Sequence, residues 1–402
     1  MNRALRGTEE GATRGAPKMR SALAIAPLYL GFAATGVGVA LPGALLPVML
    51  SRWHFQDEQG GRLFLLAWVG SSLGALLVHG SMRTVLFWGS IAVALGAVGL
   101  SFCAAGTADA WMALYGSGLG LTMTSISLIR QRQSGGTGTE LVRLNLLWAM
   151  GACACPSLTI RALTTGAIRP VLCGLAVCFV VLAAWTVLET GLAIEATVAP
   201  TAHPWTIFRA VPLGLIVMTL LVPGIEASAG GWLATYARRG GYGVAGAVAA
   251  PSCFWAGLLL SRFFWSVCNR WLTPDWTVRA SVALMAAASA ALIASGSGWL
   301  LLLAAFCMGF GIGPTYPLLL AWALRFHRGG AIFFLAGVGS ACLPWLTGFV
   351  STQRHSLRVG LAVPMAATLV MVTLSLLLPL GIWSQRRAAA ATESFEPQSP
   401  TY

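Results

Sequence analysis

Glu226 is the acidic residue whose setting most strongly suggests chemistry. It lies within the apolar stretch 208–236, which is long enough to cross a membrane. The other eleven acidic residues lie in loops, in the terminal regions or at the ends of apolar segments. An ionised side chain at the centre of a bilayer costs about 2.5–3.5 kcal/mol on insertion scales. We therefore expect Glu226 to face water, to have a partner or to carry a proton part of the time.

Two interpretations of Glu226 follow. The functional one is a carboxylate that couples to a proton or another cation, or that accepts a hydrogen bond from a polar solute. The structural one is an acid that pairs with a neighbouring helix or extends outward towards Arg238 and Arg239. Pro223 and Gly224 lie just before it, and an interrupted helix at membrane depth exposes backbone carbonyls where a cavity can use them.

Polar and aromatic side chains on other apolar segments are the candidates for lining such a cavity. Aromatic faces combined with amide and hydroxyl groups suit sugar-like ligands, although each Trp can equally anchor a helix at the membrane interface. The candidates are Thr122, Asn145, Trp148, Trp232, Tyr236, Trp255, Tyr316 and Trp345.

Arg262 is the deepest basic residue within the apolar segments. Its helix is expected to run inward, which places Arg262 in the inner half of the membrane, where its long side chain can reach the interface. We expect Glu226 at a different depth, towards the outer third of the bilayer, so a direct pair between the two is not predicted. Arg262 is assigned a structural or gating role.

The composition indicates an integral membrane protein. Of the 402 residues, 57% are hydrophobic and only 9% are charged, whereas soluble domains carry about 25% charged residues. The net charge of +13 comes from basic residues scattered singly between apolar runs, which is typical of membrane topology and not of nucleic-acid binding. The nine cysteines show no metal-binding spacing, and no Ser/His/Asp set lies within the apolar segments, so we expect no cofactor and no enzymatic activity.

The hydropathy pattern predicts an all-α membrane protein with twelve transmembrane helices in two pseudo-symmetric six-helix bundles. We expect a cytoplasmic tail at 1–20, bundles at 21–188 and 208–384, a cytoplasmic linker at 189–207 and a second cytoplasmic tail at 385–402. The predicted segments are 22–50, 63–80, 85–106, 110–129, 142–163, 170–188, 208–236, 243–268, 277–294, 299–324, 331–350 and 359–383.

The distribution of basic residues predicts the orientation. With an even number of spans, the side that holds both termini carries 16 Lys and Arg residues and the opposite side carries 8. The positive-inside rule then places both termini in the cytoplasm. A multi-pass protein of a bacterial inner membrane is the expected location.

The two halves repeat each other in sequence. Three motifs recur in the same order at similar offsets, as expected for two bundles related by an axis along the membrane normal. They are Gly116-x-Gly118-x-Gly120-x-Thr122 with Gly309-x-Gly311-x-Gly313-x-Thr315, Gly151-x₄-Pro156 with Gly339-x₄-Pro344, and Leu41-Pro-Gly43 with Val222-Pro-Gly224.

Three stretches resemble the major facilitator superfamily and, within it, the fucose–proton symporters and the sodium-dependent glucose transporter-like proteins. They are Gly224-Ile-Glu-Ala-Ser-Ala-Gly-Gly-Trp-Leu-Ala-Thr-Tyr236, Gly309-Phe-Gly-Ile-Gly-Pro-Thr-Tyr-Pro317 and Gly339-Ser-Ala-Cys-Leu-Pro-Trp-Leu-Thr-Gly348. The resemblance implies a transporter whose halves rock about a site at the membrane midplane, with sugars as the first substrate class.

The chain departs from that family at its cytoplasmic signature, a Gly-x-x-x-Asp-Arg pattern. The second copy reads Ser266-Val-Cys-Asn269-Arg270 and lacks the acid, and of the first copy only Arg83 and nearby glycines are recognisable. Arg83 and Arg270 are therefore gating or structural candidates by resemblance. The acidic residues that fucose symporters carry in helices 1 and 4 are also absent, which leaves Glu226 or no coupling.

We therefore predict a secondary transporter or facilitator for a small polar solute, a sugar or related metabolite. The protein is expected to be a monomer in contact with the lipid bilayer. Any coupling ion is expected to be a proton or sodium. The alternative is an exporter of amphipathic compounds. A large apolar cavity, with Asn145 and Tyr316 facing lipid or packing, would favour the exporter.

Overall fold

The computed structural model describes residues 9–134, 138–189, 195–196, 207–268, 271–326 and 331–380, and nearly all of them are helical. The first half contains α1 (Glu9–Trp53), α2 (Asp57–Leu76), α3 (Met82–Phe102), α4 (Ala108–Gln133), α5 (Gly138–Leu158), α6 (Ile160–Thr165) and α7 (Arg169–Leu188). The second half contains α8 (Ile207–Ala210), α9 (Leu213–Ala237), α10 (Gly243–Cys268), α11 (Pro274–Ala294), α12 (Gly298–Phe326), α13 (Ala331–Arg354), α14 (Leu357–Gly360) and α15 (Ala362–Leu377).

Each predicted apolar segment overlaps either one helix or a short helix together with the long helix beside it. Helix α1 begins at Glu9, so part of the sequence assigned to the N-terminal tail is helical. Two strands of two residues each, β1 (Gly80–Ser81) and β2 (Glu195–Ala196), pair antiparallel and bring part of the predicted linker against the start of α3. The all-α prediction is otherwise matched by the described residues.

Ten stretches of the described chain are long and apolar enough to cross a membrane, where the sequence predicts twelve. One of the ten, Leu213–Trp265, has 53 residues and contains both α9 and α10. At about 1.5 Å per residue it would be roughly 80 Å long, far more than a bilayer needs. The stretch is kinked at Gly241, whose φ of 85° is left-handed. Helix α2 is not among the ten. The protein is a multi-pass integral membrane protein.

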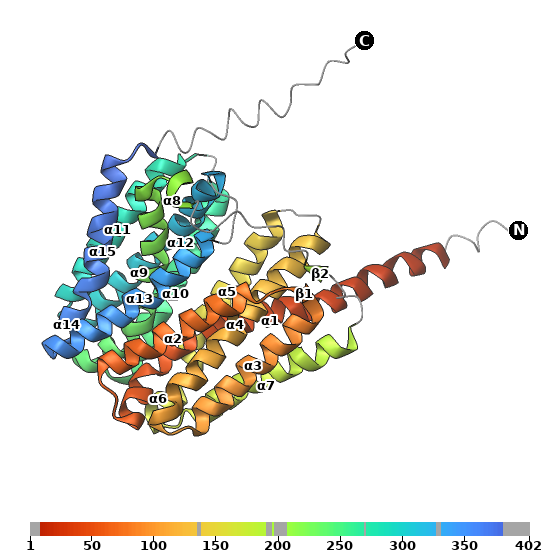
Figure 1. Cartoon of the computed structure of the whole chain (residues 1–402), viewed down its shortest axis with the longest axis horizontal. Helices are drawn as coiled ribbons and strands as arrows, with labels where there is room; N and C mark the ends of the chain where they lie inside the picture. Colours follow the sequence, from red (N-terminus) through yellow and green to blue (C-terminus); the bar gives the residue numbers. More distant parts are fainter. Residues whose placement is uncertain are drawn as a thin grey trace, which may run out of the picture.

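The helices gather into two groups that meet along three pairs of helices. Figure 1 shows α1–α7, from red to yellow-green, on one side and α8–α15, from green to blue, on the other. Across the boundary α2 packs against α13, α5 against α10 and α1 against α9. These six helices therefore form most of the boundary between the groups.

The glycine motif of α4 reappears in α12, where it packs against the equivalent helices of the second group. In α4 a Cβ on Gly116 or Gly120 would collide with carbonyl oxygens of α2, and one on Gly118 would collide with α3. In α12 the first and third glycines of the motif, Gly309 and Gly313, lie against α10, and the middle one lies against α11. The repeat in the sequence thus marks close helix contacts that recur at matching places in the two groups.

A second glycine pair extends the correspondence. Gly151 of α5 lies against the Ala33 carbonyl of α1, and Gly339 of α13 lies against the Leu220 carbonyl of α9. Because α1 and α9 are the first long helices of their respective groups, the contacts are again equivalent. Small residues at these crossings allow the backbones to approach closely and fix the helices that line the boundary.

We expect Gly309→Ala to destabilise the protein by about 1–3 kcal/mol, because its methyl group would overlap the Phe254 carbonyl and the backbones of α10 and α12 would have to separate. Thermal unfolding of the purified protein in detergent measures the effect. Gly174→Ala is the matched control, since a Cβ at this helical glycine meets nothing within 4 Å. Equal melting temperatures for the two variants would contradict the assigned contact.

Candidate functional site

Glu226 lies near the middle of the boundary between the two helix groups. Pro212 precedes the first residue of α9, so Glu226 is thirteen residues into this helix, or roughly 20 Å along its axis. The side chain is partly exposed, although its neighbours Ile225 and Ser228 are buried. The carboxylate is thus more central than the outer-third position expected from a helix beginning at 208.

Arg262 of α10 is close enough to Glu226 for the two charges to interact electrostatically. The sequence predicted different depths and no direct pair, and no ion pair within 4.0 Å forms between them among the described contacts. The approach has a geometric cause. Helical side chains lean towards the N-terminus of their helix, and α9 and α10 run in opposite directions, so the two side chains lean towards each other.

Aromatic residues complete the cluster. The Arg262 guanidinium lies over the Trp148 ring of α5, 5.6 Å from its centroid. Trp148 and Trp255 of α10 meet edge to face, with ring centroids 5.7 Å apart. The side chain of Tyr316 of α12 lies near both Glu226 and Arg262. We call Glu226, Arg262, Tyr316, Trp148 and Trp255 the central cluster, and both helix groups contribute to it.

Several polar atoms of the central cluster have no hydrogen-bond partner. The Arg262 Nε and the Trp148 Nε1 are buried donors without an acceptor. Among the described residues, Glu226 makes no hydrogen bond and no ion pair. Leaving buried polar groups unpaired costs about 1–3 kcal/mol each, so such a set suits a ligand that brings both acceptors and donors. No group of three or more His, Cys, Asp or Glu in the described chain is arranged to hold a metal ion.

The other predicted cavity residues lie outside the central cluster. Trp232 is fully buried and donates from Nε1 to the Pro344 carbonyl, and the buried Tyr236 donates to the Leu292 carbonyl. The Trp345 ring stacks on that of Phe349 with centroids 5.7 Å apart. Trp232 and Tyr236 therefore join α9 to α13 and α11, whereas the contact between Trp345 and Phe349 lies within α13.

Thr122 and Asn145 are likewise not members of the central cluster. Thr122 is buried in α4 where Gly89 of α3 approaches, and its hydroxyl has no partner. Asn145 is exposed on α5 and donates to the Leu141 carbonyl of its own helix. Asn145 lies three residues before Trp148 on the same helix, and Tyr316 belongs to the central cluster, so neither position favours an exporter.

The structure describes only one of the two gating candidates, Arg83 and Arg270, that were taken from the family resemblance. Arg83 donates hydrogen bonds to the Thr186 carbonyl at 2.7 Å and to the Val187 carbonyl, and so caps the C-terminus of α7. Its contacts remain within the first helix group. Arg270 lies outside the described residues.

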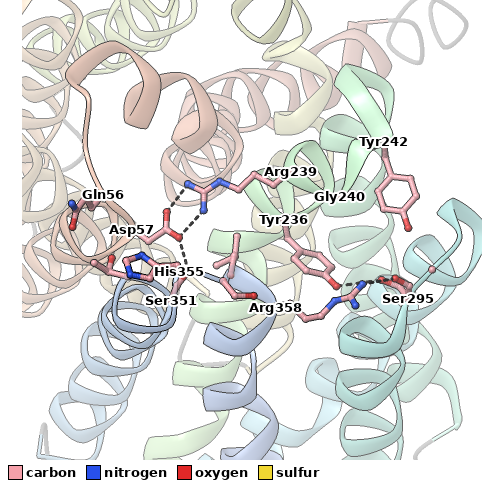
Figure 2. A pocket seen from close by; sticks show the side chains of 14 residues that line it. Gln56, Asp57, Tyr236, Arg239, Gly240, Tyr242, Ser295, Ser351, His355 and Arg358 are labelled. Carbon is pink, nitrogen blue, oxygen red and sulfur yellow. Dashed lines mark hydrogen bonds and ion pairs between the residues drawn. The ribbon is translucent and has the colours of Figure 1, made fainter.

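A polar lock that the sequence did not predict joins the groups at the end of the molecule where α2 begins. We call this end the Asp57 end. Asp57 of α2 accepts two hydrogen bonds from Arg239, both at 2.6 Å, and a third from Ser351 of α13 at 2.5 Å. Figure 2 shows this arrangement. Forked arginine–carboxylate pairs are among the stronger hydrogen-bonded contacts in proteins, and the Asp57 side chain is only 7% exposed.

Two further contacts cross the boundary at the Asp57 end. Arg238 donates to the Leu163 carbonyl of α6 at 2.8 Å, and the Thr352 hydroxyl accepts a hydrogen bond from the Glu58 backbone N–H at 2.8 Å. Both contacts lie beside the Asp57–Arg239 pair, at the ends of the helices that they join. The two groups are therefore held together by polar contacts at the Asp57 end.

A second buried ion pair lies at the opposite end and within the first group. Arg130 of α4 and Glu140 of α5 pair at 2.9 Å, and each side chain is 7% exposed. The Tyr29 hydroxyl of α1 donates to Glu140 at 2.6 Å, and the Arg130 guanidinium lies over the Tyr29 ring. This network ties three helices of one group together, so the group can move as a unit.

Comparison with known proteins identifies the fold. No family model and no curated protein matches the chain. A crystal structure of the nucleoside transporter NupG, as a D323A mutant, matches 88% of this chain and 98% of its own length with a TM-score of 0.67. The chain has the NupG fold. Only 13% of the aligned residues are identical, so the likeness concerns the fold.

Proposed function

We propose that the protein is a secondary transporter of the major facilitator superfamily that moves a small polar solute by alternating access. The observation that carries this proposal is the central cluster, in which an unpaired carboxylate, an arginine and two tryptophans meet between the two helix groups. The NupG-like fold and the matching glycine contacts support two halves that can rock about such a site.

The proposed architecture has twelve spans, with six-helix bundles at 21–188 and 208–384, a linker at 189–207 and tails at 1–20 and 385–402. Counting α9 and α10 separately and including α2 would bring the ten candidate stretches to twelve. The three segments that resemble fucose–proton symporters support a place in that branch, and we propose a monomer as the working unit.

The proposed orientation places both termini in the cytoplasm of a bacterial inner membrane, following the basic residues. In that orientation the Asp57 end faces outward. The contacts around Asp57 then close the outer side, and the state described is one in which the central cluster is separated from the outside.

The proposed solute is a sugar-containing metabolite. The central cluster offers a carboxylate acceptor, guanidinium and indole donors and two indole rings, which together suit hydroxyl groups beside a flat apolar surface. Nucleosides combine a sugar with a planar base, and NupG is a nucleoside transporter. We propose nucleosides and free sugars as the first candidates, with proton or sodium coupling through Glu226.

A binding screen tests this proposal on the purified full-length protein. We expect a nucleoside such as uridine, or a free sugar, to raise the melting temperature, since a ligand that binds only the folded state stabilises it. A Trp148→Ala variant should lose that rise, whereas Trp299→Ala, at an exposed tryptophan of α12, should keep it. A response confined to lipophilic drugs would favour an amphipath exporter instead.

A further inference from the structure

A pocket lies at the Asp57 end and not at the central cluster. It has a volume of about 750 Å³, and its lining is mainly polar. Most lining residues belong to the second helix group, and Gln56 and Asp57 close one side from the first group. Figure 2 shows the Asp57–Arg239 pair on one side of the pocket and Arg358, beside Tyr236 and Ser295, on the other.

The lining contains more cationic than anionic groups. Two arginines, Arg239 and Arg358, and the imidazole of His355 face a single carboxylate, that of Asp57. Arg358 donates one hydrogen bond, at 3.1 Å, to the Ser295 carbonyl. In the described chain Arg358 has no carboxylate partner within 4.0 Å, so its charge is not neutralised locally.

Asp57 has little capacity left for a second cation. Its Oδ1 accepts from Arg239, and its Oδ2 accepts from both Arg239 and Ser351. The guanidinium of Arg358 therefore keeps free N–H donors that point at no protein anion. A planar oxyanion matches such a fork of donors.

We propose that this pocket is a binding site for a small soluble oxyanion that carries a phosphate or carboxylate group. Arg358 is its main anchor, and His355 and Arg239 supply further donors. Because Asp57 already holds Arg239, its negative charge opposes the incoming anion. Anion binding and the Asp57–Arg239 pair therefore compete, so the anion weakens the lock between the two helix groups. The proposal does not depend on which solute the central cluster takes.

Titration with inorganic phosphate tests the site in the purified full-length protein. At constant ionic strength, with chloride as the replacement anion, we expect phosphate to raise the melting temperature in a saturable manner. Arg358→Gln should abolish this response. Arg354→Gln is the matched control, because Arg354 is an exposed arginine at the end of α13, four residues earlier, that does not line the pocket, and this variant should respond like the wild type.

A second variant moves the response in the opposite direction. Asp57→Asn removes the only carboxylate of the lining and should strengthen phosphate binding by about tenfold. Misfolding of a variant cannot produce a tighter site. An unchanged phosphate response in Arg358→Gln, an equal response to chloride, or weaker binding in Asp57→Asn would each overturn the proposal.

Nanodiscs distinguish the source of the phosphate group. In phosphatidylcholine nanodiscs the response to inorganic phosphate should persist. If it also persists in phosphatidylglycerol nanodiscs, the pocket takes a free anion. Its loss there alone would mean that a lipid headgroup occupies the pocket, which would overturn the assignment to a soluble ligand.

Discussion

Glu226→Gln should abolish the accumulation of solute against a gradient while leaving exchange of solute partly intact. Glutamine keeps the size and hydrogen-bonding ability of the side chain but cannot take up a proton or hold a cation. A coupling ion can drive the conformational change only if it binds one state more tightly than the other. Without that difference, concentrative uptake should fall at least tenfold, towards the level of simple equilibration.

Proteoliposomes with an imposed ion gradient measure the two activities separately. Concentrative uptake reports coupling, and counterflow between preloaded and external solute reports exchange. Asp109→Asn is the control, since this carboxylate pairs with Arg62 on the surface of the first helix group and should behave like the wild type. Unchanged concentrative uptake by Glu226→Gln would remove Glu226 from the mechanism.

Asp57→Asn should shift the protein towards a state that is open at the Asp57 end. The substitution weakens two charge-assisted hydrogen bonds to Arg239, and such bonds contribute about 1.5–3 kcal/mol each. A total loss equal to one such bond changes the ratio of two conformations by about tenfold to a hundredfold. Initial uptake rates should fall, because one half of the transport cycle then dominates.

Reversing the charges provides a sharper form of the same test. The double substitution Asp57→Arg with Arg239→Asp keeps an ion pair across the boundary and should recover part of the uptake rate, whereas each single substitution should not. Glu58→Gln is the matched control, because only the backbone N–H of Glu58 contacts the second group. Full activity of the single variants would show that the lock does not limit the cycle.

The membrane class and Glu226 are predictable from the sequence for a simple reason. A charged side chain within a long apolar segment has a large insertion cost. Both the apolar segment and the acidic residue within it can therefore be recognised in the amino-acid sequence. The glycine motifs are equally visible, because a close crossing of two helices excludes every side chain at the crossing point. The matching contacts of Gly116 and Gly309 follow directly from their spacing.

The polar lock could not be predicted in the same way. Asp57 and Arg239 both lie at helix ends, where charged residues are ordinary, and 182 positions separate them. Only the packing of α2 against the turn between α9 and α10 brings them together. The electrostatic interaction of Arg262 with Glu226 could not be predicted for a related reason, because residue counts locate the Cα atom whereas the long side chain decides which groups the charge approaches.

The cavity candidates show the limit of choosing residues by type. Trp148 and Trp255 meet at the boundary, whereas Trp232 and Tyr236 use their polar atoms on backbone carbonyls. All four belong to apolar segments of similar composition. The rotation of each helix about its own axis separates them, and that rotation is set by contacts with neighbouring helices.

The distance between the two helix groups at both ends tests alternating access most directly. Spin labels would be attached to cysteines introduced into a cysteine-free variant. One pair of labels joins Gly106 and Gln353 at the Asp57 end, and the other joins Leu188 and Thr273 at the opposite end. None of these four residues belongs to the polar lock or to the pocket. In Asp57→Asn, compared with the wild type, the first distance should lengthen and the second should shorten. If both distances stay fixed, or both change in the same direction, the two groups do not rock about the central cluster.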